Sequence, residues 1–319
     1  MHKLVALLLL LSCLNSNGQK PEKVLVSQSD TSGLYKTSEP DSNTLFYLKM
    51  VPGGKPAGVL VILPGSGEMV EDVLKQINLH NLAVRNNLLV IFPSINHGTV
   101  KQVAEHRFLD TIFKQVIRQY ELPLNKFIIG GFSAGGMLAL TYTETAHQYK
   151  DSTVIIPLAV FGVDPPLDYA HLWNHCKKDI GRNFSDPAIQ EAKSIMQSYR
   201  QELGGSPEEF PGNYAKYSIF SYSMNDGGNA RYLIHTPVLL FTEPDILWQM
   251  KNRHRDFYDL NCADISAMIN LLQTEGNRDA ELVVTNNKGR RLNGMRHPHS
   301  WSIMDSSCCM AWILKQLAR

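Results

Sequence analysis

A serine between glycines lies in the middle of the segment 126–140, KFIIGGFSAGGMLAL. The apolar residues 127–130 are typical of a short buried strand, and the apolar end of the segment is typical of a helix. A serine in so tight a turn projects its hydroxyl above the sheet, where the free N–H groups of the helix favour a developing oxyanion. Gly131 and Gly135 have no Cβ to collide with the neighbouring strand and helix. The pattern predicts that Ser133 is a nucleophile.

The elements that would position this serine are visible as alternating apolar patterns. Six further runs predict buried strands, at 44–50, 58–63, 88–93, 152–160, 236–241 and 281–285. Apolar spacing predicts helices at 100–120, 188–203, 264–272 and 305–317. Strands that alternate with helices pair in parallel through right-handed crossovers, so the sequence predicts an α/β class with a mostly parallel sheet.

The alternation is interrupted over about 162–235. Proline pairs, glycine pairs and aromatic residues replace the strand and helix patterns there. We interpret this stretch as an insertion between two strands of the sheet. Its aromatic residues form either a wall for a substrate or a small core of the insertion itself, and the sequence leaves both open. The aromatic and histidine residues concerned are Trp173, His175, Tyr214, Tyr217, Phe220 and Tyr222.

Together, the G-x-S-x-G turn and the strand–helix order resemble the α/β-hydrolases, in particular secreted, esterase-like serine hydrolases of bacteria. The resemblance covers nearly the whole chain after residue 18. It implies one α/β-hydrolase domain over 19–319, with a mostly parallel central sheet, flanking helices and an inserted cap at about 162–235.

The resemblance also implies the partners of Ser133. The family places its acid just past the strand predicted at 236–241, where Asp245 fits best and Glu243 is the second candidate. It places its histidine between the last strand and the last helix, where His299 is preferred because an aromatic residue follows it closely. His297 is the second candidate for the base, or a supporting neighbour of His299.

The family's oxyanion hole is built from two backbone N–H groups on either side of the nucleophile. One follows the strand predicted at 58–63, in the sequence Pro-Gly-Ser-Gly of residues 64–67, and the other follows the nucleophilic serine. The resemblance therefore implies that the amides of Ser66 and Ala134 bind the oxyanion.

The first 18 residues have the pattern of an export signal. Lys3 is followed by the apolar run 4–11, which is too short to cross a bilayer comfortably, and then by small polar residues. A signal peptidase would cut near Gly18. The alternative is a lipobox ending at Cys13, which would become a lipid anchor. Either route predicts a secreted or periplasmic protein, in the second case as a lipoprotein.

Composition excludes several function classes. The formal net charge is +1 and no basic block stands out, so nucleic acid is not an expected partner. No later segment resembles a membrane span. The four remaining cysteines, whose disulfide pairing the sequence does not reveal, lack metal-binding spacing. They are Cys176, Cys262, Cys308 and Cys309. No metal or organic cofactor is expected.

The expected activity is that of an exported serine hydrolase acting through an acyl-enzyme. Carboxylic esters are the preferred substrates, either small molecules or acyl groups linked to a polymer such as a carbohydrate. Peptidase or acyltransferase activity is an alternative, because the same three side chains serve each reaction. A non-catalytic exported binding protein with this fold is the alternative of another class.

Overall fold

The structure, a computed structural model, describes residues 20–27, 33–37, 45–149 and 151–319. The predicted export signal over 1–18 and the candidate lipidation site Cys13 lie outside the described residues.

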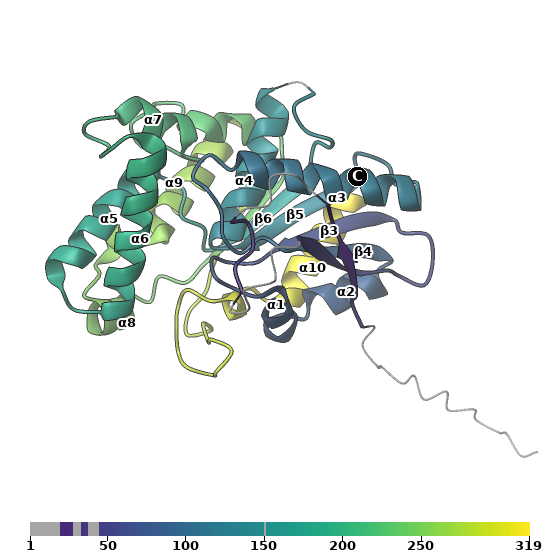
Figure 1. Cartoon of the computed structure of the whole chain (residues 1–319), viewed down its shortest axis with the longest axis horizontal. Helices are drawn as coiled ribbons and strands as arrows, with labels where there is room; N and C mark the ends of the chain where they lie inside the picture. The colour runs from purple at the N-terminus through teal and green to yellow at the C-terminus, as the bar shows by residue number, and fades with distance from the viewer. Residues whose placement is uncertain (1–19, 28–32, 38–44, 150) are drawn as a thin grey trace, which may run out of the picture.

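A sheet of eight strands runs through the centre of the described part of the chain (Figure 1). The strand order is β1-β2-β4-β3-β5-β6-β7-β8. The strands from β4 to β8 in this order are parallel, and β2 and β1 add antiparallel pairs at one edge. The bounds are β1 Glu22–Leu25, β2 Phe46–Met50, β3 Gly58–Leu63, β4 Leu88–Pro93, β5 Phe127–Phe132, β6 Ala159–Val163, β7 Val238–Thr242 and β8 Ala280–Val284.

Helices cover both faces of the sheet. Figure 1 shows α3 and α4 on one face and α2 and α10 on the other, where these last two pack together. The predicted α/β class and α/β-hydrolase architecture are therefore confirmed. The helices are α1 Val70–Gln76, α2 Leu79–Arg85, α3 Val103–Tyr120, α4 Ala134–Gln148, α5 Tyr169–Arg182, α6 Asp186–Leu203, α7 Pro211–Tyr217, α8 Ile246–Arg253, α9 Asn261–Thr274 and α10 Ser306–Leu317.

The central strands are continuous apolar runs because both of their faces are covered. Every residue of β3, β4 and β5 is buried. One predicted boundary is wrong: the strand expected at 152–160 is β6, which begins only at Ala159 and extends to Val163. The apolar residues before it include the exposed Ile156 and form a connector instead. Because β6 ends at Val163 and not at residue 160, its end lies beside the end of β5, where Val163 pairs with Phe132.

Between β6 and β7 the chain forms α5, α6 and α7, which gather at one end of the sheet (Figure 1). These helices enclose a hydrophobic core of their own, in which Trp173, Tyr199 and Tyr214 are buried. Of the aromatic residues in question, Trp173 and Tyr214 thus belong to the core of the insertion, whereas Tyr222 is 56% exposed.

All four cysteines of the described chain are free, and only Cys308 is exposed. No helix among the described residues combines the length and apolar character needed to cross a membrane.

Candidate active site

Ser133 occupies the turn between β5 and α4, as predicted. Its backbone has φ 52° and ψ −118°, a conformation that non-glycine residues rarely adopt. Its amide donates a hydrogen bond of 2.9 Å to the carbonyl of Val163 on β6. A Cβ on Gly131 would lie 2.5 Å from the carbonyl carbon of Gly135, and one on Gly135 would collide with the backbone of β3. The two glycines therefore permit the close approach that this turn needs.

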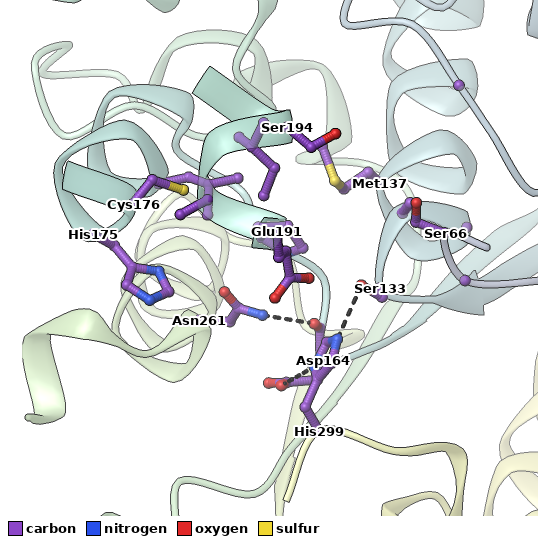
Figure 2. Close-up of a pocket in the computed structure, with 18 of the residues that line it drawn as sticks. Ser66, Ser133, Met137, Asp164, His175, Cys176, Glu191, Ser194, Asn261 and His299 are labelled. Atoms are coloured by element: carbon purple, nitrogen blue, oxygen red, sulfur yellow. Dashed lines mark hydrogen bonds and ion pairs between the residues drawn. The ribbon is translucent and has the colours of Figure 1, made fainter. Parts of the chain in front are cut away.

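The structure brings His299 onto this serine. His299 Nε2 lies 3.0 Å from Ser133 Oγ, and His299 Nδ1 lies 2.6 Å from Asp164 Oδ2 (Figure 2). Because a carboxylate only accepts hydrogen bonds, Nδ1 carries the proton and Nε2 presents its lone pair to the hydroxyl. The three side chains thus have the relative geometry of a serine–histidine–aspartate triad.

Asp164 directly follows β6 and is held by three contacts besides His299. Thr242 Oγ1, at the end of β7, donates a hydrogen bond of 2.7 Å to Asp164 Oδ1. The Asp164 amide donates to the carbonyl of Phe241, and Asn261 Nδ2 donates to the Asp164 carbonyl at 2.9 Å (Figure 2). Both carboxylate oxygens therefore have partners, and the side chain is fixed toward the imidazole.

The expectation that Asp245 or Glu243 orients the histidine is corrected by this geometry. Asp245 begins α8, where its Oδ1 accepts from the Trp248 amide at 3.2 Å, and its Oδ2 pairs with Arg296. Glu243 has a fully buried side chain and lies 2.5 Å from Arg296. Neither carboxylate contacts His299; both contact the arginine three residues before it.

Glu243 also binds the loop that carries the histidine. Its carboxylate accepts hydrogen bonds from Thr285 Oγ1 and from the amides of Lys288 and Gly289, at 2.8 to 3.1 Å. The acidic residues at the end of β7 therefore anchor the histidine loop, while the acid that faces the imidazole comes from β6.

His297, the second candidate for the base, lies beside His299 rather than on Ser133. The two ring centroids are 6.5 Å apart, and His297 Nδ1 is 3.0 Å from the His299 carbonyl oxygen. Burial, followed by the nearby positive groups, lowers the pKa of His297 to about 3. His297 is therefore neutral and packs against the loop as a neighbour of His299.

The sequence reasoning missed Asp164 because it ended the strand before β7 at residue 160 and placed Asp164 inside the insertion. The signal that was present is the run Ala-Val-Phe-Gly-Val of 159–163, with an aspartate directly after it. The carboxyl ends of adjacent parallel strands meet at one edge of the sheet, so β6 is as well placed as β7 to supply the acid.

The two amides predicted for the oxyanion hole are both at the site. Ser66 and Ala134 line the same pocket as Ser133, and neither backbone N–H has an acceptor among the described residues. Glu68 shapes the first of these loops, because its Oε2 accepts from the Gly65 amide at 2.9 Å and from Trp301 Nε1 at 2.8 Å. One carboxylate thereby joins the Ser66 loop to the histidine loop.

A pocket of about 420 Å³ opens over Ser133. Its floor is formed by the ends of the strands, and its walls come from α5 and α6 of the insertion and from the region around α8. Figure 2 shows side chains of the insertion, among them Cys176 and Ser194, across the pocket from Ser133. In the described part of the chain, no three histidine, cysteine, aspartate or glutamate side chains are grouped so that they could hold a metal ion.

No protein-family model matches the chain, and no curated protein sequence matches it. Solved structures do resemble it. An acylaminoacyl peptidase from Pyrococcus horikoshii is 12% identical with a TM-score of 0.56, and the match covers 93% of this chain and 40% of that one. This chain therefore spans less than half the length of that peptidase.

Two smaller enzymes match over most of both chains. A lipase in its open form has a TM-score of 0.52 at 12% identity, with 86% of this chain and 96% of the other covered. An S-formylglutathione hydrolase from Agrobacterium tumefaciens has a TM-score of 0.51 at 11% identity, with 93% of each chain covered. At such identities the likeness establishes the α/β-hydrolase fold alone.

Proposed function

We propose that this chain is a serine hydrolase that cleaves carboxylic esters through a covalent acyl-enzyme. The observation that carries the proposal is the hydrogen-bonded series from Ser133 through His299 to Asp164, at the end of a pocket that admits a small molecule. The acylaminoacyl peptidase, the lipase and the S-formylglutathione hydrolase that share the fold support acyl transfer by analogy.

In the first step, His299 Nε2 accepts the proton of Ser133 Oγ while that oxygen attacks the ester carbonyl carbon. Asp164 holds the Nδ1–H of His299 and stabilises the imidazolium that forms. The carbonyl oxygen becomes an oxyanion, and the free amides of Ser66 and Ala134 are placed to donate to it. Loss of one such donor typically costs about 3 kcal/mol of transition-state stabilisation.

In the second half of the reaction, the imidazolium gives its proton to the departing alkoxide oxygen, and the acyl group remains on Ser133. A water molecule then attacks the acyl-enzyme while His299 again accepts a proton, and the acid is released with Ser133 regenerated. Side chains of α5 and α6 form one wall of the pocket in which both halves of the reaction take place.

A fluorophosphonate probe tests the nucleophile, because it reacts only with an activated serine. We expect covalent labelling of the folded protein at Ser133, located by peptide mass spectrometry. Ser133→Ala should abolish the adduct and His299→Ala should reduce it strongly, with circular dichroism to verify that both variants are folded. If the folded wild-type protein is not labelled, the non-catalytic binding protein is the better reading.

A parallel assay separates the alternative chemistries. The labelled enzyme should hydrolyse aryl and alkyl esters faster than the matching amides. Faster cleavage of amides would favour a peptidase, and product esters formed in the presence of added alcohols would favour an acyltransferase.

We also propose that the protein is exported, on the evidence of the pattern in residues 1–18. Expression of the full chain in a bacterial host should place it outside the cytoplasm. The mature N-terminus should begin after Gly18 if a signal peptidase processes it, or at a lipidated Cys13 if the lipobox is used. A cytoplasmic protein with an intact N-terminus would contradict export.

A further inference from the structure

Two arginines of the pocket wall have no carboxylate partner. Arg253, at the end of α8, and Arg291, on the histidine loop, both line the pocket that contains Ser133. In contrast, Arg255 in the same wall binds Asp179 with Nη2 2.5 Å from Oδ2, and Arg296 binds Glu243. Within the described chain, no carboxylate oxygen lies within ion-pair distance of Arg253 or Arg291.

Both arginines contact His297, the neighbour of the candidate base. Arg253 Nη2 lies 3.3 Å from His297 Nε2, and Arg291 Nη2 lies 3.5 Å from His297 Nδ1. Because His297 Nδ1 is close to the His299 carbonyl, that nitrogen carries the proton and only Nε2 accepts a hydrogen bond. Arg253 therefore has an acceptor in His297 and a second in Ser185 Oγ at 2.6 Å, whereas the Arg291 guanidinium has none in His297.

Other charges near the two arginines do not neutralise them. Glu191 on α6 lines the pocket and is exposed, without an ion-pair partner among the described residues. It lies beyond ion-pair distance of both arginines. Two other carboxylates act on them but already have partners: Asp179, near Arg253, is paired with Arg255, and Glu68, near Arg291, accepts from the Gly65 amide and Trp301 Nε1. Burial, the largest effect, lowers the pKa values of Arg253 and Arg291, whereas nearby carboxylates raise them in part.

The same region of the pocket has a polar group without a partner. Gln249, on α8 one turn before Arg253, is only 6% exposed, yet its Oε1 has no hydrogen bond. The hydroxyl of Tyr169, at the start of α5, is also buried and unpaired. Buried polar atoms are nearly always satisfied in folded proteins, so unpaired ones in a pocket indicate the place of a polar ligand. The Gln249 oxygen only accepts, so it calls for a hydroxyl or amide donor on the ligand rather than for an anion.

We propose that the ester substrate carries an oxyanion, and that Arg253 and Arg291 bind it in the same pocket as Ser133. This inference rests on the proposed ester hydrolysis. Guanidinium groups bind carboxylate and phosphate oxygens through paired, charge-assisted hydrogen bonds. Both arginines contact His297, whose ring centroid lies 6.5 Å from that of His299. The part of the substrate that joins the bound anion to the scissile carbonyl at Ser133 is therefore short.

A matched series of para-nitrophenyl esters tests the inference. The neutral member is the pentanoate, the carboxylate member is the hemiglutarate, and the phosphonate member has a phosphonate in place of the free carboxylate. We expect kcat/KM for one of the anionic esters to exceed that for the pentanoate by about tenfold or more at low ionic strength. The advantage should shrink as salt is added. The better anionic member identifies the class of oxyanion.

Arg253→Gln and Arg291→Gln should each lower kcat/KM for the anionic ester by about tenfold and leave the neutral ester nearly unchanged. Arg290→Gln is the matched control, because Arg290 is exposed like its neighbour Arg291 but does not line the pocket. Equal losses on neutral and anionic esters, or a wild-type enzyme without preference for either anion, would overturn the inference and leave the ester hydrolase intact.

Binding provides a readout that does not need turnover. Ser133→Ala should bind monomethyl glutarate, or its phosphonate counterpart, in calorimetry, and it should bind methyl pentanoate more weakly. The added double change of Arg253 and Arg291 to glutamine should remove this difference. If no ester is hydrolysed but the arginine-dependent binding persists, the hydrolase proposal fails and the anion site stands. If Ser133→Ala binds neutral and anionic esters alike, the anion site is wrong.

Discussion

Two histidine–aspartate pairs in this molecule have the same geometry and different surroundings. His299 Nδ1 lies 2.6 Å from Asp164, and His171 Nδ1 lies 2.6 Å from Asp264. The second ring nitrogen distinguishes them. His299 Nε2 faces the hydroxyl of Ser133, whereas His171 Nε2 faces the backbone carbonyl of Tyr258.

The partner of that second nitrogen decides the charge of the ring. A carbonyl oxygen only accepts, so His171 donates from both nitrogens and is a cation. The Asp264 hydrogen bond is the main cause that raises the pKa of His171 to about 9. A hydroxyl can donate, so His299 retains a lone pair for the serine proton. The His171 pair joins α5 to α9 as a structural contact, and only the His299 pair is arranged for proton transfer.

The largest expected effect is on catalysis and distinguishes the two aspartates. Asp164→Asn should lower kcat for ester hydrolysis by about 10⁴-fold, because an amide facing Nδ1 favours the wrong tautomer. Asp264→Asn should leave kcat within a few fold of wild type. Steady-state kinetics of both variants make the comparison, and a similar loss in both would show that the two pairs are not functionally distinct.

A smaller effect concerns the pH dependence of stability. The folded pKa of His171, about 9, is above its ordinary value of 6.5, so its contribution is fully present below about 6.5 and is lost as pH rises through about 9. The shift corresponds to at most about 3 kcal/mol. Burial raises the pKa of Asp264, so keeping its carboxylate charged in the folded protein costs free energy. This cost reduces the net contribution of the His171–Asp264 pair to the free energy of unfolding.

Urea unfolding of wild type and His171→Gln across this pH range measures the contribution. The difference in unfolding free energy should be largest below pH 6.5 and should disappear above about 9. A difference that does not change with pH would show that His171 acts through packing rather than through its charge.

The third effect tests how Asp164 is held. Thr242→Val removes the hydroxyl that donates to Asp164 Oδ1 and leaves a buried carboxylate oxygen without a partner. We expect kcat/KM to fall by about tenfold, since hydrogen bonds to charged groups contribute about 1.5 to 3 kcal/mol. Thr242→Ser keeps the hydroxyl and should restore most of the rate. No loss in the valine variant would mean that Asp164 does not need the hydrogen bond from the Thr242 hydroxyl.

The smallest effect is expected at the residue that the sequence favoured as the acid. Asp245→Asn weakens one of two carboxylate contacts of Arg296, while the buried Glu243 remains on that arginine. Because the Asp245 side chain is partly exposed, we expect a loss of less than about 1 kcal/mol in stability and little change in kcat. A loss as large as that of Asp164→Asn would restore Asp245 to the catalytic site.

The sequence alone determined the parts of the site that depend on local geometry. The turn around Ser133 needs glycine on both sides and a strand and helix next to it, and all of these are contiguous in the chain. The Ser66 amide and His299 were placed by the resemblance to the α/β-hydrolases, which assigns their roles to the loops after particular strands. The parallel sheet followed from the same alternation.

Tertiary structure decided which carboxylate reaches the histidine. Asp164, Glu243 and Asp245 all follow strands that end at the same edge of the sheet, and no sequence spacing distinguishes their distances to His299, which lies more than 50 residues further along the chain. The choice depends on where β6 ends and on Arg296, which binds both acidic residues of the β7 end. Tertiary structure also brings Arg253 and Arg291 together, because their shared pocket exists only after α8 and the histidine loop have packed together.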